Sequence, residues 1–491
     1  MAGIVSYGAY LPRLRLNRMA IFNTVGFLAP ALMTAAKGER TMCNWDEDAM
    51  TMAVASSRDC LTGMDKSKIE GVYLASTSVP FADRSNAGVL ATALNLDEKV
   101  TCADFSSAQK AGTSALVAAL KAAQGTKSKN FLVTASDQRR TKAAWFHEMW
   151  FGDGAGSLLL GCDNVIAEFI GSNSVSYDFV DHYRGRDEKY DYNWEERWIR
   201  DEGYMKIYAE SIGGLLEKTG TKINEVAKLC YPCFMGRAHG GVAKKLGASP
   251  EQVASNMHAE AGECGVAHPF ILFVRELEQA NPGDKIVVAG FGQGSDALLF
   301  QVTDKIKELP SRMGVSGSLA RRKEEQNYAK FLKFNELIET EMGIRAESPK
   351  QTALSALWRK RNLILGFVGG KCTKCGTPQI PSERVCVNPD CGAVDSQEEY
   401  EFADQPATIL TYTGDMLAVS VDPPAIYGLV QFTNGGRMMM DFTDCSLADV
   451  EVGVPVKMQF RRKYYDAQRG FTGYFWKAAP EFSPESGGQG G

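Results

Sequence analysis

Four cysteines near residue 380 constrain the fold of this chain more than any other feature. The segment KCTKCGTPQIPSERVCVNPDCG places Cys372, Cys375, Cys386 and Cys391 in the order C-x2-C, ten residues, C-x4-C. Tetrahedral Zn²⁺ takes four thiolate ligands, and two tight cysteine turns joined by a short hairpin supply them. The alternative is four cysteines that hold no metal. Because no histidine or fifth ligand is near, the pattern predicts a closed, structural zinc ribbon.

Length and composition limit the remaining possibilities. The chain has 491 residues, 44% of them hydrophobic and 23% charged, with a formal net charge of −5. This length exceeds what one hydrophobic core usually supports, so we expect about three structural units. The charge argues against a nucleic-acid partner. No signal peptide or run of about 18 apolar residues is present, and the other cysteines are scattered, so we expect a cytoplasmic protein without a membrane partner.

The N-terminal part alternates apolar, β-rich runs with Ala-rich helical segments. GVYLAST, KNFLVTAS and GDKIVVAG are the runs, and AGTSALVAALKAAQG is typical of the helices. This pattern predicts an α/β domain with buried central strands. NFLVTAS followed by GDGAGSLLLG resembles KIVVAGFGQGSDALLF, about 140 residues later, which indicates a duplicated half-domain. The alternative is that unrelated core strands with glycines look alike.

The C-terminal part has a different pattern. RRKEEQNYAKFLKFNELIETEMG is charged and has helical spacing, and the short strands that follow the cysteines fit a small five-stranded barrel. Such barrels often bind oligonucleotides, but this one has no basic signal beyond RRK. The expected domains are an α/β domain at 1–310, a helical linker at 311–365, a zinc ribbon at 366–398, an OB-type barrel at 399–480 and a disordered tail at 481–491.

Several dispersed motifs together resemble a known family. They are GIVSYGAYLPRLRLNRMAI, NWDEDAMTMAVASSRDCL, FGDGAGSLLLG, YMKIYAESIGGLLEKTG, VAKKLG and GFGQGSDALLF. Over residues 3–305 the chain resembles 3-hydroxy-3-methylglutaryl-CoA synthase of the archaeal type, a branch of the thiolase superfamily. Residues 330–480 resemble the separate zinc-ribbon and OB-fold protein that accompanies acyl-CoA thiolases and synthases of this branch.

The resemblance implies a five-layer thiolase-like α/β fold with duplicated half-domains, followed by a rubredoxin-like zinc ribbon and an OB-type β-barrel. It also implies a CoA thioester substrate and either a homodimer or a complex with a second thiolase-like subunit. In GFGQGSDALLF, it implies that Gly292, Gly294 and Ser295 contact CoA.

The departures from the family pattern concern its chemistry. At the four positions where the family has a Cys nucleophile, a Glu base, a His and a Gly-Asn-Thr turn, this chain has Gln109, Thr77, Pro232 and Gly262-Glu263-Cys264 respectively. A glutamine amide is not nucleophilic, whereas a thiolate is. The sequence therefore predicts that no acyl-enzyme forms at position 109.

Other residues near these positions are candidates for catalysis. Gln109 is expected at a helix N-terminus, where its amide N–H could anchor an oxyanion or carboxylate. In GECGVAHP, Glu263 and His268 are suited to proton transfer, and the alternative is a surface loop with a hydrogen-bonded histidine. Cys264 could bring a thiol back to the site, as could Cys102 and Cys233, although buried cysteines are more often inert.

Two classes of function, and a remainder, fit this sequence. The favoured hypothesis is an aldol-type carbon–carbon lyase or ligase acting on a β-hydroxyacyl-CoA, because such a reaction needs a base and an enolate donor but no acyl-enzyme. The resemblance supports it, since thiolase-like aldolases with a zinc-ribbon/OB partner lack the nucleophile. The second is a catalytically silent subunit that supplies its zinc/OB module to an active thiolase or acyltransferase. The third hypothesis is an enzyme that retains synthase, acyltransferase or decarboxylase chemistry.

Overall fold

The computed structural model describes residues 2–125, 129–341 and 351–481. The chain divides into two compact units. Unit 1 comprises Met1–Cys43, Asp48–Gly88 and Leu96–Ile338, and unit 2 comprises Asn44–Glu47, Val89–Asn95 and Glu339–Gly491. No helix among the described residues has both the length and the apolar character needed to cross a bilayer.

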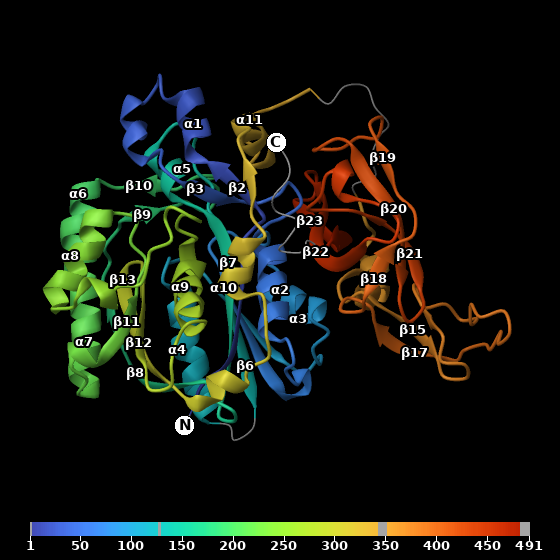
Figure 1. Ribbon diagram of the computed structural model, residues 1–491, viewed down its shortest axis with the longest axis horizontal. Coiled ribbons are helices and arrows are strands. Elements are labelled where there is room, and N and C mark those ends of the chain that lie inside the picture. The colour runs from blue at the N-terminus through green and yellow to red at the C-terminus, as the bar shows by residue number, and fades with distance from the viewer. Residues whose placement is uncertain (1, 126–128, 342–350, 482–491) are drawn as a thin grey trace. The chain divides into compact units, whose positions relative to one another are not determined.

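Unit 1 is organised by a nine-stranded sheet in the order β11-β12-β13-β8-β1-β7-β6-β4-β5 (Figure 1). Its strands are β1 (Gly3–Tyr10), β4 (Ile69–Ala75), β5 (Thr101–Phe105), β6 (Asn130–Gln138), β7 (Asp153–Gly161), β8 (Ala167–Ser176), β11 (Val226–Cys230), β12 (Lys285–Phe291) and β13 (Gly294–Val302). β4 runs parallel to β5 and β6, and β11 runs parallel to β12. The other neighbours are antiparallel.

The sheet repeats one arrangement twice, which confirms the predicted duplication. In the first half, the antiparallel pair β6–β7 lies beside the parallel strand β4. In the second half, the antiparallel pair β12–β13 lies beside the parallel strand β11. The repeated sequence segments form these two antiparallel pairs, because each combines an apolar strand with a glycine-containing strand that both become buried.

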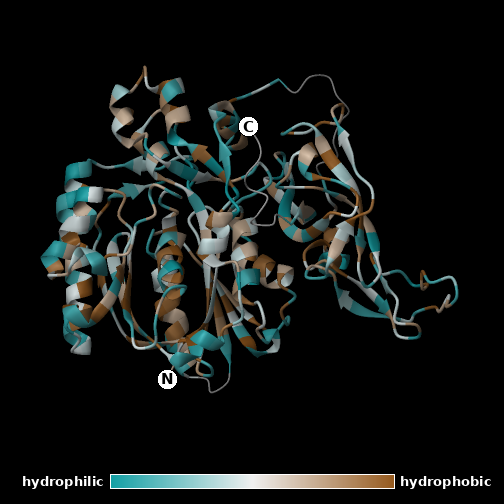
Figure 2. Cartoon of the chain, viewed as in Figure 1, coloured by the Kyte–Doolittle hydropathy of each residue, from teal (hydrophilic) through white to brown (hydrophobic). Residues whose placement is uncertain are grey.

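Helices complete the layers of unit 1. The helices α4 (Ala111–Gln124) and α9 (His268–Leu277) contact both halves of the sheet, α2 (Ala49–Cys60) covers the outer face of the first half, and α7 (Ala209–Thr219) covers that of the second. Apolar side chains of α4 and α9, such as Leu116, Leu120, Phe270 and Phe273, are fully buried in the main core. Figure 2 shows hydrophobic residues on the central helices and on the strands beside them. This is the five-layer thiolase-like architecture that the sequence predicted.

Shorter elements surround these layers. The strands are β2 (Leu14–Asn17), β3 (Glu39–Met42), β9 (His182–Tyr183), β10 (Tyr192–Asn193) and β14 (Lys323–Glu325). The helices and single turns are α1 (Arg18–Val25), η1 (Pro30–Ala35), η2 (Lys66–Lys68), α5 (Phe146–Trp150), α6 (Glu196–Trp198), the π-helix η3 (Ile199–Tyr208), η4 (Ile223–Glu225), α8 (Gly236–Leu246), η5 (Pro250–Gln252), η6 (Gly265–Ala267), η7 (Asp304–Glu308), α10 (Gly314–Ala320) and α11 (Tyr328–Phe334). The helix α3 (Asn86–Ala93) is divided between the two units.

The expected helical linker at 311–365 is not found as predicted. Residues 311–338 of this range belong to unit 1. Part of the charged segment forms β14, which pairs in parallel with β2, and α11 is much shorter than the pattern suggested. The charge pattern could not reveal this pairing, because the partner strand lies about 300 residues earlier. Residues 342–350 of the expected linker and 482–491 of the expected tail lie outside the described residues.

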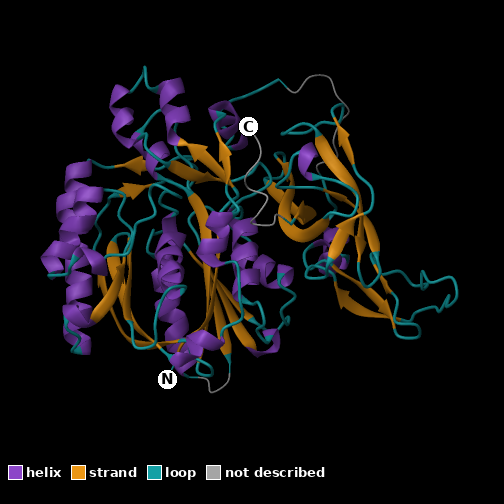
Figure 3. Cartoon of the chain, in the orientation of Figure 1, coloured by secondary structure: helices purple, strands orange, loops and turns teal. Residues whose placement is uncertain are grey.

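Unit 2 consists mainly of strands (Figure 3). A three-stranded sheet in the order β16-β15-β17 carries the four cysteines, and a six-stranded sheet forms the predicted barrel. The elements are α12 (Leu354–Arg359), α13 (Arg361–Ile364), β15 (Val368–Cys372), β16 (Pro378–Gln379), β17 (Gln397–Glu401), β18 (Ala407–Ile409), β19 (Thr413–Asp415), β20 (Ala425–Phe432), β21 (Arg437–Asp441), η8 (Leu447–Asp449), β22 (Pro455–Asp466) and β23 (Phe471–Pro480). The first predicted barrel strand is divided into β18 and β19.

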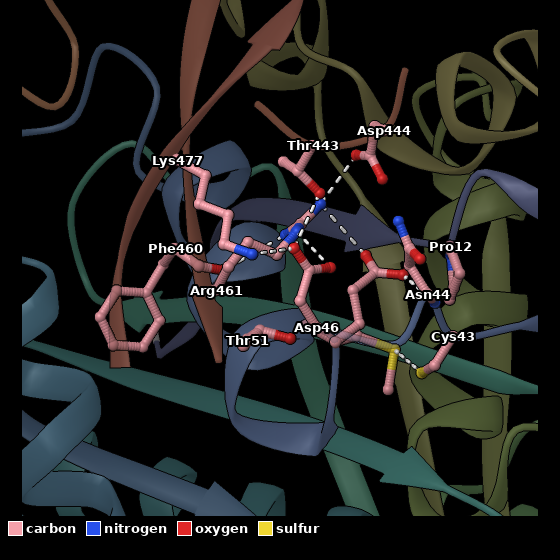
Figure 4. A network of polar contacts seen from close by, with 12 residues as sticks. Pro12, Cys43, Asn44, Asp46, Thr51, Thr443, Asp444, Phe460, Arg461 and Lys477 are labelled. Carbon is pink, nitrogen blue, oxygen red and sulfur yellow. Dashed lines mark hydrogen bonds and ion pairs between the residues drawn. The ribbon is translucent and has the colours of Figure 1, made fainter. Parts of the chain in front are cut away.

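A buried network of charges lies inside unit 2 (Figure 4). Arg461 Nη2 contacts Asp444 Oδ2 at 2.8 Å and Glu47 Oε1 at 3.2 Å. Asp46 Oδ2 accepts hydrogen bonds from Lys477 Nζ at 2.9 Å and from the hydroxyl of Thr443 at 2.9 Å. All these side chains are buried. Three carboxylates therefore depend on two cations for compensation.

We expect Arg461→Ala to destabilise unit 2 by about 3 to 5 kcal/mol, because the substitution leaves buried carboxylates without their cation. Urea denaturation of the full chain, followed by circular dichroism and by the fluorescence of the buried Trp476, measures the loss.

Arg384→Ala is the matched control in the same unit. Its ion pair with Asp395 is exposed, so we expect a change of at most about 1 kcal/mol. Equal effects of the two substitutions would contradict the importance of the buried network.

Candidate functional site

The carboxylate of Asp137 connects three segments at one edge of the sheet. Asp137 lies at the end of β6 and is fully buried. Its Oδ1 accepts hydrogen bonds from the hydroxyls of Ser76 at 3.1 Å and Ser78 at 2.8 Å and from the backbone N–H of Thr77 at 2.8 Å. Its Oδ2 accepts from the backbone N–H of Val266 at 3.0 Å. The carboxyl ends of β4 and β6 and the turn before α9 are thereby fixed together.

Gln109 stands beside this network, directly before α4. The helix begins at Ala111 with Lys110 as its N-cap, as the sequence predicted. A Cβ atom at Gly292 would lie 2.7 Å from the backbone N of Gln109. Position 292 therefore requires glycine, and the close approach of the two backbones holds Gln109 at the pocket.

The hydrogen bonds determine how the Gln109 amide is oriented. Both oxygens of Asp137 accept backbone N–H groups. The hydroxyl of Thr77, 3.1 to 3.2 Å from these oxygens, is therefore the donor in its contact with Asp137. Thr77 Oγ1 then accepts from Gln109 Nε2 at 3.2 Å. Gln109 Oε1 is buried and has no hydrogen-bond partner among the described residues. The amide thus offers a free acceptor and a second N–H.

A cavity of about 400 Å³ opens beside Gln109. Polar side chains make up most of its wall, and no cysteine is among the described residues that line it. These residues are Ser76, Thr77, Val79, Ser106, Ser107, Ala108, Gln109, Asp181, His182, Tyr183, Arg184, Gly185, Arg186, Asp191, Gly292 and Gln293. We call this cavity the Gln109 pocket.

A histidine–aspartate pair enters the Gln109 pocket from the segment around β9. His182 Nδ1 lies 2.8 Å from Asp181 Oδ2. A carboxylate at this position favours the tautomer with the proton on Nδ1, which leaves Nε2 as the acceptor. Asp181 is buried, and its Oδ1 has no partner among the described residues.

Asp191 fixes the β9–β10 hairpin against the rest of unit 1. One carboxylate oxygen pairs with Arg184 Nη1 at 2.9 Å and the other with Arg139 Nη2 at 3.2 Å. Arg184 also donates to the backbone carbonyl of Thr77. Burial raises the pKa of Asp191, but Arg139, followed by His182 and Arg184, outweighs it and lowers the pKa overall. The hairpin that carries His182 is therefore attached directly to the segment beside Gln109.

Glu263 is buried behind the same cluster. Burial raises the pKa of its carboxyl to about 7, although Arg139 and His182 act in the opposite direction. Its Oε2 has no partner among the described residues. At the end of this turn, Gly265 has φ +57°, and a Cβ there would lie 2.3 Å from Asp137 Oδ2. The turn that carries Glu263 therefore depends on glycine.

The other catalytic candidates lie elsewhere. His268 is fully buried, with Nδ1 accepting from the backbone N–H of Cys264 at 3.2 Å and Nε2 lying 3.0 Å from the backbone O of Asn256. Burial lowers the pKa of His268 to about 4 and raises the pKa of the Cys264 thiol. None of Glu263, Cys264 and His268 lines the Gln109 pocket. A catalytic role of these three residues therefore stays a prediction.

Of the three residues expected to contact CoA, one lines the Gln109 pocket and two do not. Gly292 lines the Gln109 pocket, whereas Gly294 and Ser295 do not. The hydroxyl of Ser295 is buried and accepts from that of Ser211 at 2.7 Å.

A second cavity, of about 670 Å³, adjoins the first at Asp191. Aromatic and charged side chains dominate its wall, which we call the Trp145 pocket. Its residues are Arg140, Thr141, Lys142, Trp145, His147, Phe151, Asp191, Tyr192, Asn193, Trp194, Glu195, Glu196 and Arg197. The rings of Trp145 and Trp194 are about half-exposed.

In unit 2, the four predicted ligands come together. The sulfur atoms of Cys372, Cys375, Cys386 and Cys391 all lie within 4.8 Å of one another. Cys372 Sγ is 3.9 Å from Cys391 Sγ, and Cys375 Sγ is 3.5 Å from Cys386 Sγ. A tetrahedral zinc with Zn–S bonds of about 2.3 Å requires sulfur separations of about 3.8 Å. The four thiols fit zinc.

Sequence reasoning missed Asp137 and the residues from the β9–β10 region. Asp137 directly follows the apolar run NFLVTAS, and a charged residue at the end of a buried strand could have revealed it. Asp181, His182, Arg184 and Asp191 lie in YDFVDHYRGRDEKYDYNW, which has no periodicity that distinguishes functional from surface charges.

The raised pKa of Glu263 has a consequence for stability. Between about pH 4.5 and 7 the folded protein retains a proton that the unfolded chain releases, so this group's contribution to stability falls as the pH rises. The variant Glu263→Gln cannot lose this proton, so we expect its stability not to fall in this way. The free energy of unfolding of the variant minus that of the native protein should therefore rise by up to about 3 kcal/mol between pH 4.5 and pH 7. Thermal unfolding at pH 5, 6, 7 and 7.5 measures the difference.

Glu260→Gln, on the same segment, is the control, because the carboxylate of Glu260 is partly exposed and paired with Arg275. A pH-independent difference for Glu263→Gln would show that the carboxyl of Glu263 is ionised throughout this range.

Comparisons with known proteins agree with this architecture. Residues 216–300 match the 3-oxoacyl-[acyl-carrier-protein (ACP)] synthase III C-terminal domain, and residues 400–461 match the C-terminal OB-fold domain of ChsH2. The structure is similar to that of an HMG-CoA synthase complexed with CoA, with a TM-score of 0.61, 18% identity and coverage of 72% of this chain and 94% of the other. It is also similar to 3-oxoacyl-[acyl-carrier-protein] synthase III from Aquifex aeolicus, with a TM-score of 0.55, 20% identity and coverage of 61% and 100%.

Sequence relatives identify the family more closely. The hydroxymethylglutaryl-CoA synthase of Methanosarcina mazei is 30% identical over 344 residues, which are 67% of this chain and 96% of that protein. The enzyme of the same name from Methanobrevibacter smithii is 29% identical over 340 residues, covering 68% and 98%. The chain therefore belongs to the hydroxymethylglutaryl-CoA synthase family and carries in addition a C-terminal OB-fold domain of the ChsH2 type.

Proposed function

We propose that this protein makes or cleaves a carbon–carbon bond in a β-hydroxyacyl-CoA by aldol chemistry, without a covalent acyl-enzyme. One observation carries the proposal: Gln109 stands at the start of α4 with its Oε1 unpartnered among the described residues, in a pocket shared with the His182–Asp181 pair. A pocket with free acceptors and a base suits a substrate that supplies a hydroxyl. The named activity of the relatives supports the thioester part of the proposal.

The two adjoining cavities can divide the substrate between them. In this proposal the Trp145 pocket accepts CoA, because its aromatic rings can stack on a base and Arg140 and Lys142 can pair with phosphates. The Gln109 pocket then accepts the acyl group. The side chain of Asp191 lines both cavities and would lie beside the thioester.

His182 is the proposed base. In the cleavage direction its Nε2 takes the proton of the β-hydroxyl while Asp181 stabilises the resulting imidazolium through Nδ1–H. The electron pair of the O–H bond forms the new carbonyl, and the Cα–Cβ pair moves onto the thioester as an enolate. No acyl transfer to the protein occurs in this step.

Gln109 serves the substrate oxygens in this proposal, and His182 returns the proton. Gln109 Oε1 can accept the substrate hydroxyl on binding, before His182 takes its proton, and the remaining N–H of the amide can donate to the enolate oxygen. The proton that His182 takes from the β-hydroxyl returns from its Nε2 to the enolate carbon, which forms the C–H bond of the released acyl-CoA. Protons and electrons then balance over the cycle.

We expect Gln109→Ala to fold normally and to lower kcat/KM for β-hydroxyacyl-CoA cleavage by the equivalent of about 2 to 4 kcal/mol, the size associated with one oxyanion contact. The assay follows acetyl-CoA released from 3-hydroxybutyryl-CoA and from 3-hydroxy-3-methylglutaryl-CoA.

Gln124→Ala, an exposed position at the other end of α4, is the control and should retain full activity. If the native protein cleaves neither thioester, and Gln109→Ala supports full activity of a complex with a second thiolase-like subunit, the lyase proposal fails and the silent-subunit hypothesis replaces it.

We also propose that the four cysteines of unit 2 bind one structural zinc. The support is the close grouping of four thiols at separations that tetrahedral zinc requires. Bound zinc would hold the turn at Cys372–Cys375 to the turn at Cys386–Cys391. With all four positions occupied by sulfur, the metal would have no open site for substrate.

Metal analysis of the purified protein should therefore find one zinc per chain, and Cys386→Ser should lower both the zinc content and the thermal stability. Cys445→Ser provides a control outside the cluster, because its thiol is not among the four ligands. Purified native protein that is stably folded and free of metal would contradict the proposal.

A further inference from the structure

The β9–β10 hairpin stands between the two cavities of unit 1. Residues 181–186, around β9, line the Gln109 pocket, and residues 191–197, around β10, line the Trp145 pocket. The two strands form a separate sheet of their own. Asp191 is the one described residue that lines both cavities. A single hairpin therefore separates the space proposed for the acyl group from the space proposed for CoA.

The hydrophobic core fixes the two ends of this segment but not the hairpin itself. Phe179, before β9, and Ile199, after β10, pack in the core of the second half of unit 1. Between Ala167 and Ile199, a stretch that the structure describes in full, no apolar side chain is buried. The rings of Tyr183 and Tyr192 contact each other across the hairpin and are more than half exposed. Segments with few buried apolar contacts are those that open at low cost in free energy.

A buried ion cluster joins the hairpin to the body of unit 1. The carboxylate of Asp191 lies between Arg184 Nη1 at 2.9 Å and Arg139 Nη2 at 3.2 Å. Arg184 belongs to the hairpin, whereas Arg139 directly follows β6 and its guanidinium lies over the ring of Phe151 at 3.8 Å. The side chains of Arg139 and Asp191 are only 5% and 7% exposed. Because Arg139 is held by the body of unit 1, the hairpin can move away only if its ion pair with Asp191 breaks.

This cluster lies where an acyl-CoA must pass. A thioester that fills both cavities extends from one to the other at Asp191, the residue that they share. Paired charges in a buried place are a poor surrounding for the methylene groups of an acyl chain. Movement of the hairpin would remove the barrier, and it would break the ion pair without exposing an apolar core.

We propose that the β9–β10 hairpin is a gate between the two cavities. While Asp191 is paired with Arg139 the gate is closed, and it opens transiently to let the acyl group of a bound acyl-CoA enter the Gln109 pocket. This inference rests on the proposed function, since it assumes that CoA and the acyl group occupy different cavities. The chain near Phe179 and Ile199 serves as the hinge, because the core fixes it there.

The gate also controls the proposed base. His182 is part of β9, so its imidazole lies beside the Gln109 pocket in the closed hairpin and leaves with the hairpin when it opens. Closure after the acyl group has entered would bring the base to the substrate and exclude water. Opening is therefore a step that precedes the chemistry, and it has a rate of its own.

The test compares free CoA with butyryl-CoA in stopped-flow binding experiments on the full chain. The signal is the fluorescence of Trp145 and Trp194, which line the Trp145 pocket. Butyryl-CoA has no β-hydroxyl, so it binds without being cleaved. Free CoA needs one cavity, and we expect its observed binding rate to rise in proportion to its concentration. Butyryl-CoA should add a phase whose rate reaches a limit at high concentration, because the hairpin must open first.

Asp191→Asn should raise this limiting rate at least about tenfold, because an amide carries no charge to pair with Arg139. Hydrogen exchange of the backbone amides at 182–193 should become faster in the same variant. Lys189→Ala is the matched control on the same hairpin. Lys189 is exposed and donates to the backbone O of Glu336 at 2.9 Å, and loss of such a surface contact should change the limiting rate by no more than about twofold.

The outcomes separate the gate from the proposed function. If butyryl-CoA shows no limiting rate, or if CoA and butyryl-CoA share the same one, the hairpin does not separate the cavities and this inference is overturned while the proposed function stands. An unchanged limiting rate in folded Asp191→Asn also overturns it. Should that variant fail to fold, the comparison of the two ligands on the native protein still decides. If the native protein binds neither ligand, the proposed function itself fails.

Discussion

Asp137 accepts hydrogen bonds from the side chains of Ser76 and Ser78, from Thr77 and from the backbone of Val266, and the arrangement of the candidate site depends on these contacts. A buried carboxylate is costly unless donors surround it, so the segments that supply those donors are held at fixed positions. The hydroxyl of Thr77 donates to Asp137 and accepts from the side-chain amide of Gln109. The carboxylate of Asp137 on β6 thus sets the orientation of the Gln109 amide.

The site also contains groups that reduce stability when no ligand is bound. Gln109 Oε1, Asp181 Oδ1 and Glu263 Oε2 are buried and lack partners among the described residues. Each such acceptor costs about 1 to 3 kcal/mol when it stays unpaired. In our proposal a substrate hydroxyl satisfies Gln109 Oε1 when the substrate binds. Elsewhere in the chain the buried charges of Asp46, Arg461 and Lys477 are compensated within the protein, as a structural network requires.

Sequence patterns predicted those parts of the structure that have a regular period or a fixed ligand spacing. The helix Ala111–Gln124, the repeated pairs β6–β7 and β12–β13 and the grouping of four cysteines belong to this class. Pairings between distant segments were not predictable in this way. The parallel contact between β14 and β2 turned an expected linker into part of unit 1, because strand pairing depends on a partner that local periodicity does not reveal.

The same limit applies within the candidate site. Gln109 and Glu263 were identified from the family resemblance, whereas His182 and Arg184 lie in an irregular hairpin whose charges look like those of any surface loop. The turn that carries Glu263 and His268 shows a further limit of the sequence. The imidazole of His268 contacts backbone groups and neither side chain lines the Gln109 pocket, so a shared catalytic role of these two residues stays a prediction.

The central claim is that thioester chemistry proceeds here without a covalent acyl-enzyme. Intact-protein mass spectrometry of samples quenched during incubation with acetyl-CoA tests it most directly. The account predicts that the protein mass stays unchanged at all times. An acetyl adduct that forms at a cysteine and maps to Cys102, Cys233 or Cys264 would contradict the account and restore a thiolase-like mechanism.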